Sequence, residues 1–131
     1  MAKKKTPKDY AVDEAKLYVK ILANWTCEKC GKTKYESQMH GAHIMPVTYS
    51  GTAAEPFNLL CLCAGCHSMG AKSAHQNPVE FTRWLEEAFP GRYDKMKEMA
   101  YNYSKNPRPK RDWIEIRKQL KSMVKKLKEE Q

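Results

Sequence analysis

The fold is decided by four short motifs between positions 27 and 67: CEKC at 27–30, HGAHIMP at 40–46, NLL at 58–60 and CAGCH at 63–67. Two cysteines separated by two residues can bind one ion from a single tight turn, and two such pairs supply the four thiolates of a closed tetrahedral zinc site. A segment of this size buries little apolar surface, so a bound metal is a common way to stabilise it. The spacing therefore predicts a structural zinc ion bound by Cys27, Cys30, Cys63 and Cys66.

A fifth cysteine, Cys61, leaves a second choice of ligand open. It lies two residues before Cys63 on a predicted strand, so both side chains point to the same side. Because the spacing of Cys63 and Cys66 is the better match to a zinc-binding pair, we expect Cys61 to be a small buried apolar residue. An odd number of cysteines in a cytoplasmic protein also favours a metal over disulfides.

Composition limits the classes of protein to consider. The 131 residues include 24 Lys and Arg against 15 Asp and Glu, a formal charge of +9, which indicates a polyanionic partner such as DNA. The length fits one domain. No apolar segment follows the basic start, and no apolar run reaches the roughly 18 residues of a membrane span. We therefore expect a cytoplasmic protein that has no membrane partner.

The four motifs fall on a predicted ββα unit, with strands over 39–47 and 57–62, a loop between them, and a helix over 63–71. Before this unit, Asp9 is the expected cap of a helix that ends near residue 23. The sequence thus predicts an α+β fold. Its expected parts are a flexible basic tail at 1–9, an N-terminal helix with a zinc-stapled ββα core at 10–76, and a helical extension at 77–131.

The extension carries clear helix signals. Asn77 is a good cap, Pro78 suits the first helical position, and Glu80 completes a capping box. Further helices are expected over 93–104 and 112–129, with a break at 106–109. The last helix is apolar on one side and basic on the other, and we expect the basic side to contact DNA phosphates through Arg117, Lys118, Lys121 and Lys125.

Two histidines are placed to share a site. His43 ends the first predicted strand, and His67 follows a zinc ligand on the helix whose start that ligand fixes. Zinc would therefore hold the helix that carries His67 against the strand that carries His43. Imidazole, with a pKa near 6.5, suits the proton acceptor of a hydrolysis, and a cation would offset the charge on a phosphate. The pattern indicates metal-assisted cleavage of a phosphodiester.

These residues resemble the HNH, or ββα-metal, endonuclease family, through His43-Ile44-Met45-Pro46 and the run from Asn58 to His67. The likeness covers about residues 25–76 and is closest to small phage-borne members. It implies that His43 activates water, that Asn58 braces the loop behind it, and that His67 binds a catalytic divalent cation. That cation is commonly Mg²⁺, with Mn²⁺ or Ni²⁺ as alternatives. DNA would be cut to 5′-phosphate and 3′-hydroxyl ends in the cytoplasm of a bacterial host, with phage replication, recombination or packaging proteins as candidate partners.

One position departs from the family pattern. Many members have Asp or His directly before the base as a second ligand of the cation, whereas this chain has Ala42. His40 and His75 are the two candidates to replace it, and the resemblance favours His75. If neither binds the ion, the alternative is a non-catalytic zinc-binding module that contacts nucleic acid or protein. A cysteine redox protein is a third interpretation, but it does not explain the spacing of Asn58 and the histidines.

Overall fold

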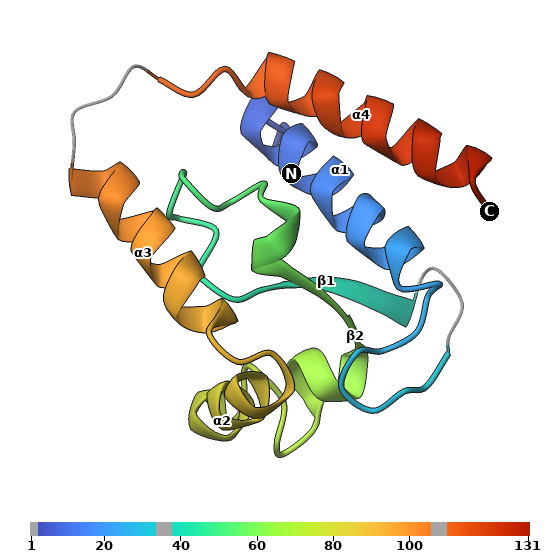
Figure 1. Cartoon of the computed structure of the whole chain (residues 1–131), viewed down its shortest axis with the longest axis vertical. Coiled ribbons are helices and arrows are strands. Elements are labelled where there is room, and N and C mark those ends of the chain that lie inside the picture. Colours follow the sequence, from blue (N-terminus) through green and yellow to red (C-terminus); the bar gives the residue numbers. More distant parts are fainter. Residues whose placement is uncertain (1–2, 34–37, 106–109) are drawn as a thin grey trace.

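A computed structural model describes residues 3–33, 38–105 and 110–131. Helices and a two-stranded antiparallel sheet make up the fold (Figure 1), which confirms the α+β expectation. The expected break at 106–109 lies outside the described residues. The elements in chain order are α1 (Pro7–Leu22), β1 (Met39–His43), η2 (Pro56–Asn58), β2 (Leu59–Cys63), η3 (Gly65–Met69), α2 (Pro78–Ala88), α3 (Arg92–Lys105) and α4 (Trp113–Glu129).

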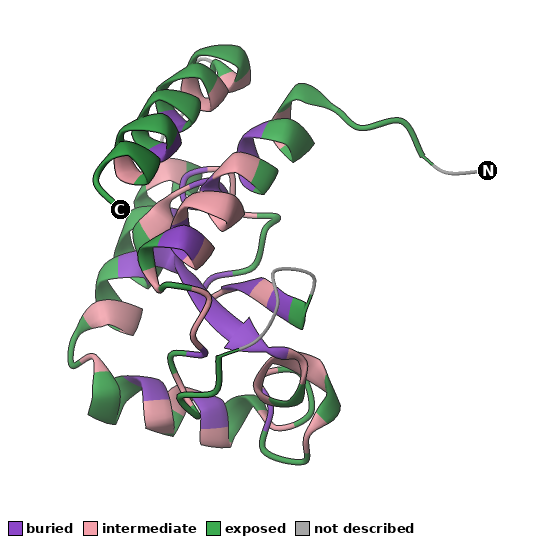
Figure 2. Ribbon diagram, turned by 90° about the vertical axis from the view of Figure 1, so that its right-hand side faces the viewer, coloured by how far each residue is buried: buried purple, intermediate pink, exposed green. Residues whose placement is uncertain are grey.

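The sheet lies at the centre of the core. β1 pairs with β2 from Met39 opposite Cys63 to His43 opposite Leu59. All five residues of β2 are buried, and Figure 2 shows this strand surrounded by the rest of the chain. α1 crosses the sheet on one side and packs against α4 on its other side (Figure 1). The two strands therefore hold their residues in a fixed register beneath α1.

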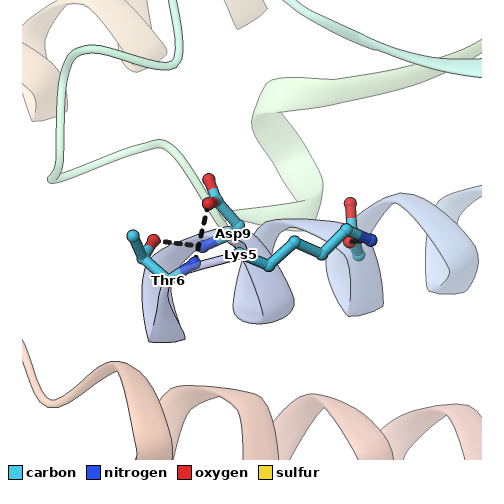
Figure 3. Close-up of polar contacts among 4 residues, drawn as sticks. Lys5, Thr6 and Asp9 are labelled. Atoms are coloured by element: carbon cyan, nitrogen blue, oxygen red, sulfur yellow. Dashed lines mark hydrogen bonds and ion pairs between the residues drawn. The ribbon is translucent and has the colours of Figure 1, made fainter. Parts of the chain in front are cut away.

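The first helix starts earlier than expected. Its cap is Thr6, not Asp9: the Thr6 hydroxyl accepts a hydrogen bond from the Asp9 N–H at 3.2 Å, and the Asp9 carboxylate accepts one from the Thr6 N–H at 2.8 Å (Figure 3). This reciprocal capping box needs an acidic residue three positions after the cap, which explains the role of Asp9. The helix therefore begins at Pro7, within the segment predicted to be a tail, and the described residues before it extend away from the body (Figure 2).

The helical part of the ββα unit is shorter than predicted. In place of a helix over 63–71, the chain makes one π-helical turn, Gly65–Met69, in which the Gly70 N–H donates to the Gly65 carbonyl at 2.9 Å. Gly70 is extended and ends the turn. A Cβ at Gly70 would lie 2.5 Å from the Gly65 oxygen, so this close approach requires glycine. The first strand is also shorter than expected, since it ends at His43.

The C-terminal extension follows its sequence signals. The Asn77 side chain caps α2 by accepting from the Glu80 N–H at 3.2 Å, and Asp112 caps α4 in the same way. α3 packs against the segment after β1, where Met45, Met96 and Ala100 form a small buried cluster. α4 runs in the same direction as α1, and at its end the Gln131 side chain donates to the Ile21 carbonyl at 3.2 Å. In the described part of the chain, no helix is long and apolar enough to cross a membrane.

Candidate metal centre and active site

The four predicted cysteines meet at one point. Their sulfur atoms all lie within 4.8 Å of one another, and Cys30 Sγ is 3.7 Å from Cys63 Sγ. Zinc–sulfur bonds of about 2.3 Å in a tetrahedron place the sulfurs about 3.8 Å apart, so this cluster fits a zinc ion. Cys61 is fully buried outside the cluster, as expected for an apolar residue.

A tight turn prepares the first cysteine pair. The Gly31 N–H donates to the Cys27 carbonyl at 2.9 Å, and the Cys27 N–H donates to the Lys32 carbonyl at 2.8 Å. Gly31 has a φ of 79°, which glycine adopts without the steric cost that a side chain brings. Burial alone would raise the pKa of Cys27, but backbone N–H donors, the first of them that of Cys30, lower it to about 7. A thiolate at this position is ready to bind a metal.

His67 lies between two other histidines. Its Nδ1 is 2.9 Å from His40 Nδ1, and its Nε2 is 3.0 Å from His75 Nε2. Both predicted partners therefore adjoin His67, but through opposite nitrogens of its ring. One ion can contact His67 and either neighbour, but in this arrangement it cannot contact all three rings. Both separations are close to the roughly 3 Å between adjacent nitrogen ligands of an octahedral ion with metal–nitrogen bonds of about 2.1 Å.

The surroundings of His67 are positive. Burial, followed by the charges of His75 and His40 and then of Lys16, lowers the pKa of His67 to about 4. A histidine with so low a pKa is neutral at physiological pH, which is the form that binds a metal. Ala42, at the position where many HNH nucleases carry a ligand, is buried and offers no donor atom.

His43 is fixed by the loop that follows β1. Its Nε2 lies 2.9 Å from the Ala53 carbonyl oxygen. Because a carbonyl can only accept, Nε2 carries the proton, and Nδ1 keeps the lone pair in the neutral ring. Burial lowers the pKa of His43 below 6.5, and the positive charges of Lys16 and Lys8 lower it further. The neutral form of the ring, with its lone pair on Nδ1, is therefore favoured.

Asn58 is fully buried and ties that loop together. Its Oδ1 accepts from the Met45 N–H at 2.8 Å, while its Nδ2 donates to the Met45 carbonyl at 3.1 Å and to the Thr52 carbonyl at 3.0 Å. Thr52 directly precedes Ala53, whose carbonyl holds His43. The Asn58 amide thus fixes both ends of the loop against which His43 rests.

These features agree with one known family. Residues 27–72 match the family model of the HNH endonucleases. The HNH segment includes the four cysteines, both strands, His40, His43, Asn58 and His67, and it ends before His75. The expected family is confirmed for this segment. No curated protein and no solved structure matches the chain.

The basic side of α4 divides into two parts. Lys118, Lys121 and Lys125 are exposed. Arg117 instead packs on α1, with its guanidinium carbon 4.6 Å from the centre of the Tyr10 ring, and its buried Nε has no hydrogen-bond partner in the described part of the chain. Of the four residues predicted to bind DNA, the three lysines therefore face solvent and Arg117 supports the helix pair.

The sequence analysis missed two cations of α1. The charges of Lys8 and Lys16 reach His43, although α1 precedes the HNH segment. The two residues are eight positions apart, which places them on one face of a helix. That spacing is visible in the sequence, but the packing of α1 on β1 is needed to connect it with the site.

Proposed function

We propose that the protein is a metal-dependent HNH endonuclease that hydrolyses phosphodiester bonds of DNA. The observation that carries this proposal is the position of the His43 ring, held by the Ala53 carbonyl on a loop that Asn58 braces, within an HNH segment. A purely structural zinc module has no need of this arrangement.

His43 has the role of general base in this proposal. Its Nδ1 takes a proton from the attacking water, and the bond from Nε2–H to the Ala53 carbonyl keeps the ring oriented while charge develops. Asn58 acts as a positioning residue, because its bonds to Met45 and Thr52 fix the loop on which that carbonyl lies. The fold supplies this geometry before DNA binds.

His67 and His40 are the residues that would hold the catalytic cation. His40 lies on a paired strand, which positions a ligand more accurately than the loop that carries His75. His75 would then hydrogen-bond the second nitrogen of His67, as is usual for a histidine ligand. A bound cation would offset negative charge on the phosphate and the leaving oxygen. Because imidazoles suit transition metals better than Mg²⁺, we expect Mn²⁺ or Ni²⁺ to support more activity than Mg²⁺.

DNA is the proposed substrate, and phage proteins are proposed partners. The net charge of +9 and the exposed Lys118, Lys121 and Lys125 support DNA as the partner. The likeness to phage-borne nucleases adds phage replication, recombination or packaging proteins in the bacterial cytoplasm.

A second candidate function is a non-catalytic zinc module that binds nucleic acid. The observation that favours it is Ala42, which removes a donor from the cation site. In this case the zinc cluster would stabilise a binding surface, and the histidines would contact each other without an ion.

Cleavage of supercoiled plasmid separates the two functions. Purified protein is incubated with Mg²⁺, Mn²⁺ or Ni²⁺ beside the variants His43→Ala, His40→Ala and His75→Ala, and the zinc content of each is measured. We expect metal-dependent nicking that His43→Ala abolishes, that His40→Ala weakens strongly, and that His75→Ala weakens less. Protein that contains one zinc per chain and cuts with none of the metals would establish the non-catalytic module.

A further inference from the structure

Lys16 of α1 crosses the strand that carries the histidines. A Cβ placed on Gly41 would lie 2.7 Å from Lys16 Cβ and 3.2 Å from Lys16 Cα, and closer still to Lys16 Cγ. The aliphatic stem of Lys16 thus fills the space above Gly41. Alternate residues of a strand point to the same face, so Lys16 lies on the face to which the His43 side chain belongs.

The Lys16 ammonium forms no ion pair with any described residue. In the described part of the chain, the ion pairs are Lys5 with Asp13 and Arg83 with Glu80. Lys16 is half-buried, and no carboxylate lies within ion-pair distance of it among the same residues. A lysine ammonium that is not paired with a carboxylate can bind an anion through a charge-assisted hydrogen bond.

The Lys16 charge lowers the pKa of His43. Its effect on His43 exceeds that of Lys8, which lies two turns earlier on α1. The next lysine along this face, Lys20, points elsewhere, with its nitrogen 5.8 Å from the centre of the Trp25 ring. Lys16 therefore lies over the face of β1 to which the His43 side chain belongs, and Lys20, one turn later, provides a matched comparison.

We propose that Lys16 binds a non-bridging oxygen of the DNA phosphate that faces His43, and so makes α1 part of the substrate site. This inference rests on the proposed nuclease function for the identity of that phosphate as the scissile one. Ala42 offers no donor atom for a cation, and the positive charge of Lys16 would add to the charge that offsets the phosphate. The fold provides this contact because only glycine at position 41 lets the lysine stem pass so close to β1.

Binding is tested first, in protein that cannot cleave. In a His43→Ala background without added metal, the affinity for a fluorescent DNA duplex is measured against salt for Lys16→Met, Lys16→Arg and the control Lys20→Met. Methionine keeps most of the stem that covers Gly41 and removes the charge. We expect Lys16→Met to weaken binding about tenfold and to reduce the salt dependence by about one ion, while Lys16→Arg and Lys20→Met stay close to the parent.

Cleavage is tested second, with His43 intact. We expect Lys16→Met to slow single-turnover cleavage at saturating DNA, Lys16→Arg to restore part of the rate, and all variants to keep one zinc per chain. Equal losses in Lys16→Met and Lys20→Met, or parent-like binding and cleavage in Lys16→Met, would overturn the role of Lys16. Absence of cleavage by the unsubstituted protein, together with a Lys16-specific loss of binding, would instead overturn the scissile assignment and the nuclease proposal.

Discussion

His43 and Asn58 show how single residues fix the geometry of the candidate site. His43 is half-buried and Asn58 is buried, and each has a specific backbone partner. His43 contacts the Ala53 carbonyl, and Asn58 hydrogen-bonds both the N–H and the carbonyl of Met45. Such bonds fix the orientation of a ring and the shape of a loop at the same time.

The pKa of His43 predicts how cleavage depends on pH. Burial and the nearby Lys16 and Lys8 lower the pKa of His43, whereas the bond to Ala53 raises it, and the net direction is downward. In the proposed mechanism the neutral ring is the base, so a lower pKa keeps it active to a lower pH. We expect the acid limb of the kcat/KM profile to have its midpoint below pH 6.5, and to move to higher pH in Lys16→Met. A midpoint above 6.5 would contradict the direction, and NMR titration of the His43 ring provides an independent measurement.

The buried hydrogen bonds of Asn58 predict that its side chain stabilises the fold. Replacement by alanine removes three buried hydrogen bonds and leaves the polar groups of Met45 and the Thr52 carbonyl without their partner. We expect the free energy of unfolding to fall by about 2–4 kcal/mol, since unpaired buried groups keep their desolvation penalty. Urea unfolding of the zinc-bound protein measures this change. An unchanged midpoint would show that the loop does not depend on the amide.

Among the elements, the short turn η3 carries both Cys66 of the cysteine cluster and the neighbouring His67. Gly70→Ala would place a methyl group 2.5 Å from the Gly65 oxygen, whereas Gly65→Ala would meet only Cys63 Sγ at 4.0 Å. We therefore expect Gly70→Ala to destabilise the fold by about 1–3 kcal/mol and to weaken cleavage, while Gly65→Ala stays close to the parent. Thermal unfolding and plasmid nicking are the measurements, and equal behaviour of the pair would contradict this account.

The elements also show where sequence reasoning succeeds. The Asn77 cap and the cysteine spacing are local signals, and each is found where the sequence places it. The predicted start of α1 was wrong because Thr and Asp are both common cap residues. Only the reciprocal hydrogen bonds show that Thr6 is the cap and that Asp9 lies three positions inside the helix. The length of η3 could not be predicted, since it depends on the contact of Gly70 with Gly65. The approach of Lys16 to His43 depends on packing between distant segments, and no local pattern reports it.

In the molecule as a whole, the cysteine cluster joins the turn at residues 27–30 to the end of β2 and to η3. The donor set predicts one zinc per chain. We expect Cys66→Ser to lose this zinc and to unfold, because metal binding in such sites is part of the folding free energy. Cys61→Ala should retain the zinc, since Cys61 lies outside the cluster. Metal analysis and circular dichroism test both, and zinc loss in Cys61→Ala would contradict the assignment.

The parallel pairing of α1 with α4 has a consequence for biosynthesis. Gln131 donates to Asn24 Oδ1 across 107 positions of the chain, and Arg117 rests on Tyr10. A ribosome therefore releases α1 long before it completes α4, and during that interval the outer side of α1 has no helix to cover it. The HNH segment, by contrast, is synthesised entirely between them. A nascent chain can thus assemble its cysteine cluster before α4 is synthesised, and the docking of α4 then covers the exposed apolar side of α1.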